Sequence, residues 1–248
     1  MKDEILKLKE EFIKIKKMGY IKCQSNGYGG IGNTLENLLN IKTGNFEIPD
    51  YYDIELKTRT KNSKFAITLF SCVPDGPLLF ETKRLKDKYG YPDRILKKFK
   101  VLNGSVYGNR KNNIGLKYSF KLKVDWNNKK LILEVYDTFG IKIENQVFWD
   151  FETLETKLLR KLKILALISA SKKKYNDDVY YNYYKMDIYL LKNFNTFLNL
   201  IEEGIIGVSF KLGVYRKGKN IGDMYDHGTS FNIYERDIEK LFILLERC

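Results

Sequence analysis

The chain has 248 residues, 44% of them hydrophobic, which suits one large domain or two intimately joined lobes with a sizeable core. It carries 44 Lys and Arg residues against 31 Asp and Glu residues, and this net charge of +13 favours a polyanionic partner. One histidine and three cysteines without metal spacing argue against Ser-His-Asp, Cys-His and histidine-rich metal sites, and free thiols fit a reduced cytoplasm. The longest apolar run, residues 164–170, is too short to cross a bilayer, so we expect no membrane association.

The N-terminal half begins with helical patterns and continues with strands. In chain order we predict an amphipathic helix ending near Gly19, a short helix at 33–40 capped by Asn33, strands at 52–59 and 64–71, a loop-rich segment at 72–117, and a hairpin of 118–126 with 130–137.

The C-terminal half mixes the two kinds of pattern. In chain order we predict a helix at 151–162, a buried strand at 163–170, a tyrosine-dense segment at 179–190, a helix ending at Gly204, two strands around a long loop at 205–234, and a last helix at 235–247. Strands mixed with helices predict an α/β or α+β sandwich.

The positive charge is unevenly distributed along the chain. Residues 81–130 hold 15 Lys and Arg residues against four Asp and Glu residues, an excess of 11 positive charges. A Lys-rich genome would spread its lysines more evenly, whereas a surface that contacts phosphates requires localised charge. The basic segment therefore favours a nucleic acid as the partner.

A motif with chemical potential lies around the predicted strand at 52–59. Successive side chains of a strand point to opposite faces, so Glu55 and Lys57 share one face while the apolar residues beside them point to the core. Asp50 lies just upstream, after Pro49, which interrupts sheet pairing and can turn the chain back. We expect the two carboxylates and the ammonium to converge.

Two carboxylates this close repel each other unless a cation lies between them. Mg²⁺ is the expected ion, held by Asp50, Glu55 and Leu56, and Mn²⁺ is expected to substitute for it. Lys57 can position or help to deprotonate the attacking water. This spacing is the PD-(D/E)xK nuclease signature, and the alternative is a solvated salt bridge on an edge strand. Glu36, on the helix before the strand, is either an auxiliary acid or an ordinary surface glutamate.

Longer segments carry a more specific resemblance. The run GIGNTLENLL, IPDYYDIELKTRT and AITLFSCVP, followed in order by YGNRKN, VDW, KLKILALISA and YDHGTSFNI, resembles the MvaI/BcnI group of restriction endonucleases. This group belongs to the PD-(D/E)xK superfamily and is related to MutH, and the chain is closer to its MvaI branch. The resemblance runs over nearly the whole chain.

The resemblance implies a fold and an activity. The fold is a central mixed sheet flanked by helices, with a catalytic lobe of about residues 1–150 and a DNA-recognition lobe of about 151–248 that form a cleft for DNA. The activity is Mg²⁺-dependent cleavage of double-stranded DNA at a short site by a cytoplasmic monomer, with a companion DNA methyltransferase and no stable protein partner. Asp50, Glu55 and Lys57 take the catalytic roles and Glu36 the auxiliary one. A MutH-like nickase and a catalytically silent DNA-binding protein remain as alternatives.

Base recognition is expected from the segment 205–234, whose polar face would enter the major groove as a two-stranded ribbon. The side chains expected on DNA are Ser209, Lys211, Tyr215, Tyr225, Asp226, His227 and Asn232. Asn109, Arg110 and Lys111 are expected on phosphates or in the minor groove, with a solvated loop as the alternative.

The predicted reading face departs from the family pattern. The MvaI pattern has an acid and an arginine where this chain has Ser209 and Lys211, a histidine in place of Tyr225 and an arginine in place of Asn232. Arginine offers guanine a bidentate fork that lysine and asparagine cannot reproduce. Family members of the MvaI type read a pentamer of the CC/NGG kind. We predict unchanged chemistry with an altered target, so that CC/WGG should not be assumed, unless other residues restore the same reading.

Overall fold

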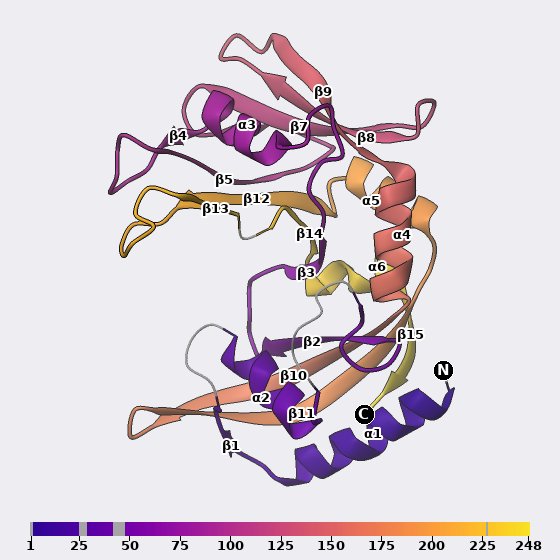
Figure 1. The fold of residues 1–248 in the computed structure, drawn as a ribbon. Coiled ribbons are helices and arrows are strands. Elements are labelled where there is room, and N and C mark those ends of the chain that lie inside the picture. Colours follow the sequence, from indigo (N-terminus) through magenta and orange to yellow (C-terminus); the bar gives the residue numbers. More distant parts are fainter. Residues whose placement is uncertain (1, 25–28, 42–47, 227) are drawn as a thin grey trace. The chain divides into compact units, whose positions relative to one another are not determined.

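The structure, a computed structural model, describes residues 2–24, 29–41, 48–226 and 228–248 and has a mixed α/β fold with three sheets (Figure 1). The chain divides into two compact units that alternate along the sequence. Unit 1 comprises Met1–Phe65, Leu158–Lys192 and Glu239–Cys248, and unit 2 comprises Ala66–Lys157 and Asn193–Ile238. These units differ from the expected halves that meet near residue 150. None of the described helices is long and apolar enough to span a membrane.

Unit 1 is built on a five-stranded sheet of order β1-β11-β10-β2, with β15 also paired to β11. Its strands are β1 (Ile21–Lys22), β2 (Ile54–Thr60), β10 (Ile164–Tyr175), β11 (Asp178–Leu191) and β15 (Phe242–Arg247). Only the β2–β10 pair is parallel, and β2 lies at the edge of the sheet. Every residue from Ile164 to Ala170 is buried, because β10 lies inside the sheet.

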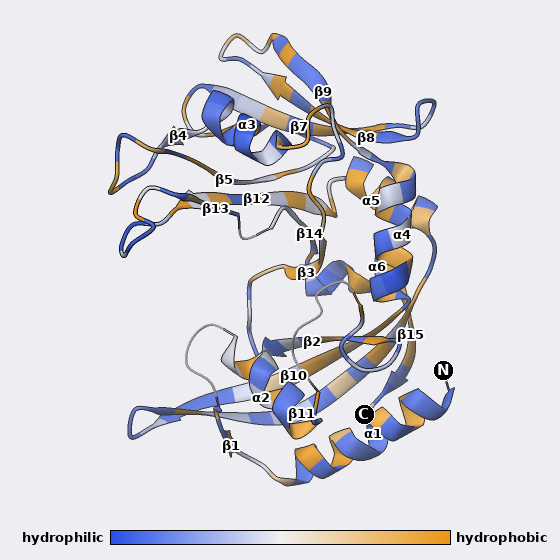
Figure 2. Ribbon diagram, viewed as in Figure 1, coloured by the Kyte–Doolittle hydropathy of each residue, from blue (hydrophilic) through white to orange (hydrophobic). Residues whose placement is uncertain are grey.

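Two helices pack on the core of this sheet: α1 (Lys2–Lys17) and α2 (Gly30–Leu38). As predicted, α1 buries one apolar stripe, visible as alternating colours along the helix in Figure 2. The stripe consists of Ile5, Leu8, Phe12 and Ile15. The prediction for α2 was wrong at its start, because the helix begins three residues before Asn33. The N-cap residue is Gly29, and the Asn33 amide already donates to the Gly29 carbonyl, so Asn33 lies inside the helix.

The predicted C-terminal helix is also wrong. Only the 3₁₀ turn η1 (Glu235–Asp237) and the short α6 (Ile238–Leu241) are helical, and the chain then extends into β15. Met186 and Cys248 exchange two backbone hydrogen bonds, at 3.0 and 2.8 Å, which pair β15 with β11. The sequence FILLER is too short and too apolar for periodicity to separate strand from helix. Residues 242–247 therefore become a strand because they pair with the edge of β11 that would otherwise be unpaired.

Unit 2 contains a six-stranded sheet of order β3-β14-β12-β5-β4, with β13 also paired to β12, and a four-stranded sheet of order β6-β7-β8-β9. The strands are β3 (Ile67–Ser71), β4 (Tyr91–Pro92), β5 (Lys100–Val106), β6 (Asn112–Ile114), β7 (Tyr118–Asp125), β8 (Lys130–Tyr136), β9 (Lys142–Asp150), β12 (Gly207–Val214), β13 (Met224–Asp226) and β14 (Ser230–Ile233). Two helices, α3 (Glu81–Tyr89) and α5 (Phe194–Glu202), belong to this unit, and the unit boundary falls within α4 (Phe151–Leu162).

The predicted hairpin at 118–137 and the predicted helix at 151–162 are confirmed by β7, β8 and α4. The prediction that residues 72–117 are loop-rich was wrong, because the segment contains α3 and β5. In α3 charged residues outnumber apolar ones, and Leu85 and Tyr89 are its only deeply buried apolar side chains among the described residues. So short an apolar stripe gives a weak helical pattern.

The segment 205–234 folds differently from the predicted ribbon. Its apolar face is buried as predicted, through Val208, Phe210, Leu212 and Val214. However, β12 pairs with β13 and β14 on one side and with β5 on the other, so it is an interior strand of a sheet. Neighbouring strands lie about 4.8 Å apart, so a six-stranded sheet is wider than the major groove, about 12 Å across, and presents a face instead of a ribbon.

Candidate active site and DNA-binding face

The predicted catalytic residues converge in unit 1, at the start of β2. The Leu56 amide donates to Asp50 Oδ2 at 3.0 Å, which holds the upstream carboxylate against the strand. Glu55 is fully buried, and Lys57 donates from its ammonium to Glu55 Oε1. The alternation of the strand thus places Glu55 and Lys57 on one side, as the sequence predicts.

A second ammonium, not predicted from the sequence, also contacts Glu55. Lys161 Nζ, near the end of α4, lies 3.4 Å from Glu55 Oε1. The approach follows from the topology, because β10 begins just after α4 and runs parallel to β2, with Leu165 opposite Glu55. The sequence shows only a lysine shortly before a buried strand. The contact of Lys161 with Glu55 depends on the pairing of β10 with β2.

Glu55 occupies an unfavourable place for an anion. Burial raises the pKa of its carboxyl and the nearby Asp50 charge adds to this rise, whereas Lys57 and then Lys161 act in the opposite direction. Its second oxygen, Oε2, is buried and accepts no hydrogen bond from any described residue. A buried carboxylate oxygen without a partner is costly and marks a position where a cation fits.

Glu36 of α2 belongs to the same cluster. Burial raises the pKa of its carboxyl, the repulsion by Asp50 raises it further, and Lys57 lowers it. The mutual influence of Glu36, Asp50 and Lys57 agrees with the prediction that the helix before the strand brings an acid to the site. Its role as an auxiliary acid stays a prediction.

The donor set at this site suits a hard cation. Asp50 and Glu55 offer carboxylate oxygens, and Mg²⁺ commonly binds through one or two carboxylates while keeping several waters. Within the described ranges, no group of three or more His, Cys, Asp and Glu residues is arranged to hold a metal ion. An ion bound here would therefore rely on the two carboxylates, on a backbone carbonyl such as that of Leu56, and on water.

The polar face of the six-stranded sheet carries a ladder of hydrogen-bonded side chains in unit 2. Thr68 donates to Asn232 Oδ1 at 2.9 Å, and Asn232 Nδ2 donates to Ser209 Oγ at 3.0 Å. Ser209 and Ser105 share a hydrogen bond of 2.8 Å between their hydroxyl groups. We call Thr68, Asn232, Ser209 and Ser105 the polar ladder. Two of its members, Asn232 and Ser209, are predicted base readers, and the structure shows both already hydrogen-bonded within the protein.

The other predicted base readers that the structure describes lie on β12, directly after it, or on β13. Lys211 is exposed on β12, opposite Asn103 of β5. Tyr215 and Tyr225 pack edge to face with ring centroids 5.2 Å apart. Asp226 is exposed and accepts a hydrogen bond of 2.7 Å from the Gly228 amide. His227 lies outside the described residues.

The three residues predicted to contact phosphates or the minor groove lie in the loop after β5, and each has different contacts. Asn109 packs against Gly204, where a Cβ atom would lie 2.1 Å from Asn109 Oδ1, and only glycine fits there. Lys111 donates to the Gly140 carbonyl at 3.2 Å, and its ammonium lies 3.9 Å from the centroid of the Tyr136 ring. Arg110 is exposed at the edge of a polar pocket. All three residues are exposed, and Arg110 is the one that borders the pocket.

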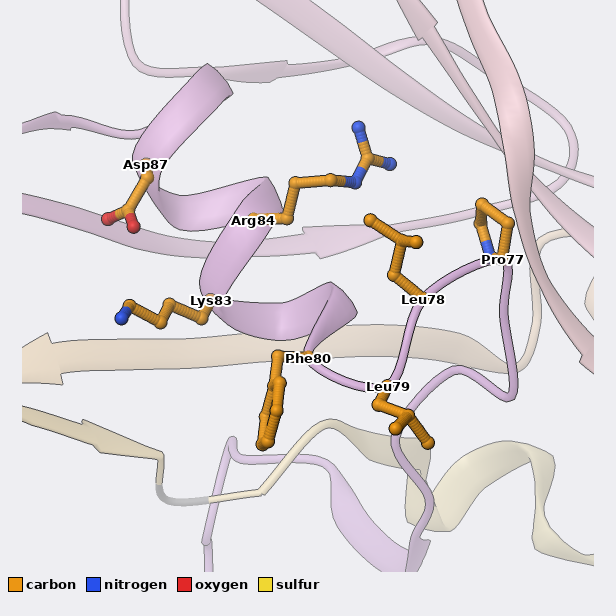
Figure 3. A pocket seen from close by; sticks show the side chains of 7 residues that line it. All are labelled: Pro77, Leu78, Leu79, Phe80, Lys83, Arg84 and Asp87. Carbon is orange, nitrogen blue, oxygen red and sulfur yellow. The ribbon is translucent and has the colours of Figure 1, made fainter.

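A separate hollow of about 610 Å³ lies beside α3 in unit 2 (Figure 3). Pro77, Leu78, Leu79 and Phe80 from the loop before the helix line it, together with side chains from the first turns of α3. It is mostly apolar, and no residue predicted for catalysis or DNA contact lines it.

Comparisons with known proteins show which proteins this chain is similar to. The sequence pattern of the MvaI/BcnI restriction endonuclease family matches residues 9–242. The structure is similar to that of restriction endonuclease MvaI in complex with its cognate DNA substrate, with 34% sequence identity and a TM-score of 0.91 over 99% of this chain and 98% of that chain. It is also similar to MvaI in the absence of DNA, with 32% identity and a TM-score of 0.64 over the same shares. No curated protein sequence matches the chain.

Proposed function

The chain belongs to the MvaI/BcnI restriction endonuclease family and is a site-specific deoxyribonuclease; on this basis we propose that it acts as a monomer and, with Mg²⁺, cuts both strands of duplex DNA at a short sequence. The observation that supports the proposal most is the convergence of Asp50, Glu55 and Lys57, with one buried oxygen of Glu55 left without a partner among the described residues. A surface salt bridge would not bury its carboxylate in this way.

The metal site proposed here consists of Asp50, Glu55 and the Leu56 carbonyl. A bound Mg²⁺ would supply charge stabilisation for the phosphate undergoing cleavage and would lower the pKa of a coordinated water, and Mn²⁺ is proposed to substitute for it. The two carboxylates bind the ion and fix its position. Because the Asp50 carboxylate accepts a hydrogen bond from the Leu56 amide, this carboxylate is oriented before any ligand binds.

Lys57 and Glu36 have complementary proposed roles. The Lys57 ammonium lies at the Glu55 carboxylate and its side chain remains 24% exposed, so it can hydrogen-bond a water and an incoming phosphate oxygen. Glu36 carries a raised pKa, so it holds a proton more readily than an exposed glutamate and can order water beside the site.

The target is proposed to differ from CC/WGG. The positions that hold charged or forked side chains in the MvaI pattern are here part of the neutral polar ladder, at Ser209 and Asn232, or carry lysine at Lys211. Lysine can donate to guanine but without the bidentate fork of arginine. The enzyme is proposed to act in the cytoplasm beside a DNA methyltransferase that protects the host's own copies of the target.

Digestion of a mixed-sequence plasmid tests the proposal. The purified protein is incubated with supercoiled plasmid and Mg²⁺, and the ends of the products are sequenced. We expect linear products with one recurrent sequence at their ends. Products that are only nicked would contradict double-strand cleavage, exclusive cutting at CC/WGG sites would contradict the altered target, and intact plasmid with both Mg²⁺ and Mn²⁺ would contradict the activity.

Three variants test the proposed active site. Asp50→Asn and Lys57→Ala should retain DNA binding and lower the cleavage rate by on the order of a hundredfold or more. Asp53→Asn is the matched control, because Asp53 is an exposed carboxylate close to the same strand. An Asp50→Asn protein that cuts as fast as the parent would place the site elsewhere.

A further inference from the structure

A polar pocket of about 500 Å³ lies in unit 2. Tyr107 and Arg110, from the loop after β5, line it together with Tyr234 and Arg236, which follow β14. Gly204, from the turn after α5, also borders it. Two arginines against the single carboxylate of Asp237 give these side chains a net positive charge, which suits an anionic ligand.

The aromatic wall of the pocket is fixed in place. The Tyr107 ring covers Gly207, where a Cβ atom would lie 2.5 Å from the ring, so this close packing requires glycine. Burial raises the pKa of the Tyr107 hydroxyl, and the nearby Tyr234 raises it further, whereas Arg110 lowers it. Tyr107 and Tyr234 thus bring the two segments together at the pocket, and Tyr107 lies two residues after Ser105 of the polar ladder.

Arg110 is oriented toward ligand binding by these neighbours. Its guanidinium carbon lies 4.2 Å from the centroid of the Tyr107 ring, and one nitrogen donates to Asn109 Oδ1 at 3.1 Å. Asn109 is in turn held against Gly204. Asn109 is the only hydrogen-bond acceptor that Arg110 meets in the described part of the chain, so the rest of its fork stays available. A stacked guanidinium loses little freedom when it binds an anion.

The pocket continues the sheet face that carries the predicted base readers. Tyr107 lies two residues after Ser105 of β5 and Tyr234 two residues after Asn232 of β14, each just past the end of its strand. The Tyr107 ring covers Gly207, which lies two residues before Ser209 on β12, so the ring lies on the face that carries Ser209. One such step is about 7 Å. The major groove is about 12 Å wide, so the phosphates that border it stand about 6 Å to either side of its midline. If Ser209 and its neighbours contact bases at the midline of the groove, a phosphate at the border of the groove would therefore lie at the pocket.

We propose that this pocket binds one phosphodiester of the DNA strand that borders the groove facing the polar ladder, with Arg110 as the principal cation. The assignment depends on the proposed DNA-binding function of this face and makes it more specific. Arg110 supplies a planar fork that matches a phosphate, Tyr107 and Tyr234 border the same space, and Arg236 adds charge at the rim. A phosphate held there would set the register of the duplex on the face, because phosphate contacts position while base contacts specify.

A thermodynamic cycle between protein and DNA tests the contact. Binding of the full-length wild type and of Arg110→Ala is measured on the duplex identified by plasmid digestion, with Ca²⁺ replacing Mg²⁺ to prevent cleavage. The duplex carries one uncharged methylphosphonate at a time, moved along both strands. We expect Arg110→Ala to weaken binding roughly tenfold or more. We also expect its plot of log K against log salt to flatten by about one unit.

The cycle should identify one phosphate. At that position the methylphosphonate should weaken binding of the wild type but not of Arg110→Ala, while all other positions affect both proteins equally. Arg110→Lys should recover only part of the affinity, because lysine keeps the charge without the fork. Lys117→Ala, an exposed lysine on the turn before β7 in the other sheet, is the matched loss of charge and should show no such coupling.

The outcomes separate this assignment from the proposed function. If the wild type does not bind or cut duplex DNA, the proposed function fails. If it binds, and every methylphosphonate affects Arg110→Ala and Arg110→Lys as it affects the wild type, only the pocket assignment is overturned. Thermal unfolding of each variant shows whether its fold is retained, and Arg110→Lys carries the test if alanine unfolds the loop.

Discussion

Glu36 lies where its own charge is disfavoured. Its carboxyl is partly buried, and the negative charge of Asp50 adds to the rise in its pKa. Glu55 is in the same situation, with a buried oxygen that has no partner among the described residues. Carboxylates held together against their mutual repulsion are typical of functional sites, where strain in the free protein is relieved by a ligand. Two consequences at the scale of single residues follow.

Glu36→Gln should stabilise the metal-free protein while it lowers activity. The folded state raises the pKa of Glu36, so the carboxyl costs no stability at about pH 4, where it is protonated, and its cost appears as pH rises through the folded-state value. The free energy of unfolding of the variant should therefore match that of the wild type near pH 4 and exceed it by less than about 1 kcal/mol at pH 7. Denaturant unfolding with a chelator, across this pH range, measures the difference.

Glu10→Gln, an exposed glutamate on α1, is the matched control and should show no comparable gain. Mg²⁺ should reduce the difference between Glu36→Gln and the wild type, because a cation relieves the same repulsion. A variant that is less stable than the wild type at pH 7 would contradict the prediction.

Lys161→Met should shift the pH profile of cleavage. Lys161 lowers the pKa of Glu55, so its removal leaves that carboxyl protonated to a higher pH. The acidic limb of the rate profile should move to higher pH, and the variant should approach the wild-type rate at high pH. Cleavage rates between pH 6 and 9 measure the shift.

Lys161→Arg should return the profile toward that of the wild type, and Lys163→Met, at an exposed neighbouring lysine, should leave it unchanged. A uniform loss of rate at every pH would show that Lys161 supports the fold only and does not position the charge on Glu55.

The sequence predicted the residues of the site that lie close together along the chain. Asp50, Glu55 and Lys57 fall within eight positions, and the period of a strand is enough to bring Glu55 and Lys57 to one side. Lys161 follows Glu55 by more than a hundred residues, and its contact arises because β10 pairs in parallel with β2. A parallel pairing leaves no local signal, so the sequence could not indicate it.

At the scale of elements, α1 contributes its stability through one face. Phe12 is 1% exposed in the core of unit 1, while the next residue, Ile13, is 44% exposed. Phe12→Ala should lower the free energy of unfolding by about 3–5 kcal/mol, and Ile13→Ala, its control on the same helix, by about 0.5 kcal/mol or less. Denaturant titration of both variants measures this, and equal losses would mean that α1 does not pack as described.

Errors in the predicted elements arose where pairing between distant strands decided the conformation. FILLER is equally consistent with a helix and a strand, and the free edge of β11 makes it β15. The alternation in β12 correctly predicted its buried face, but not that β5 would pair with its second edge. By contrast, the β7–β8 hairpin and α4 depend on local signals, a turn at Asn127–Asn128 and an amphipathic repeat, and both were predicted correctly.

At the scale of the whole molecule, the charge of +13 should govern the affinity for DNA. If the basic segment 81–130 contacts phosphates, binding of the metal-free protein to duplex DNA should weaken by about a thousandfold from about 50 to about 200 mM salt, with a linear dependence of log K on log salt. Fluorescence anisotropy with a labelled duplex measures it. A weak salt dependence would indicate that the lysines reflect the composition of the genome instead of a DNA-binding surface.

The alternation of the two units along the chain limits how such an enzyme can acquire a new specificity. The sheet that carries the polar ladder is assembled from two stretches of sequence, separated by β10 and β11 of the sheet in unit 1. A single recombination event cannot transfer that face intact from one gene to another. Members of this lineage are therefore expected to change target through single substitutions of surface side chains. To engineer a new target, individual positions have to be redesigned, because no contiguous segment carries the whole face.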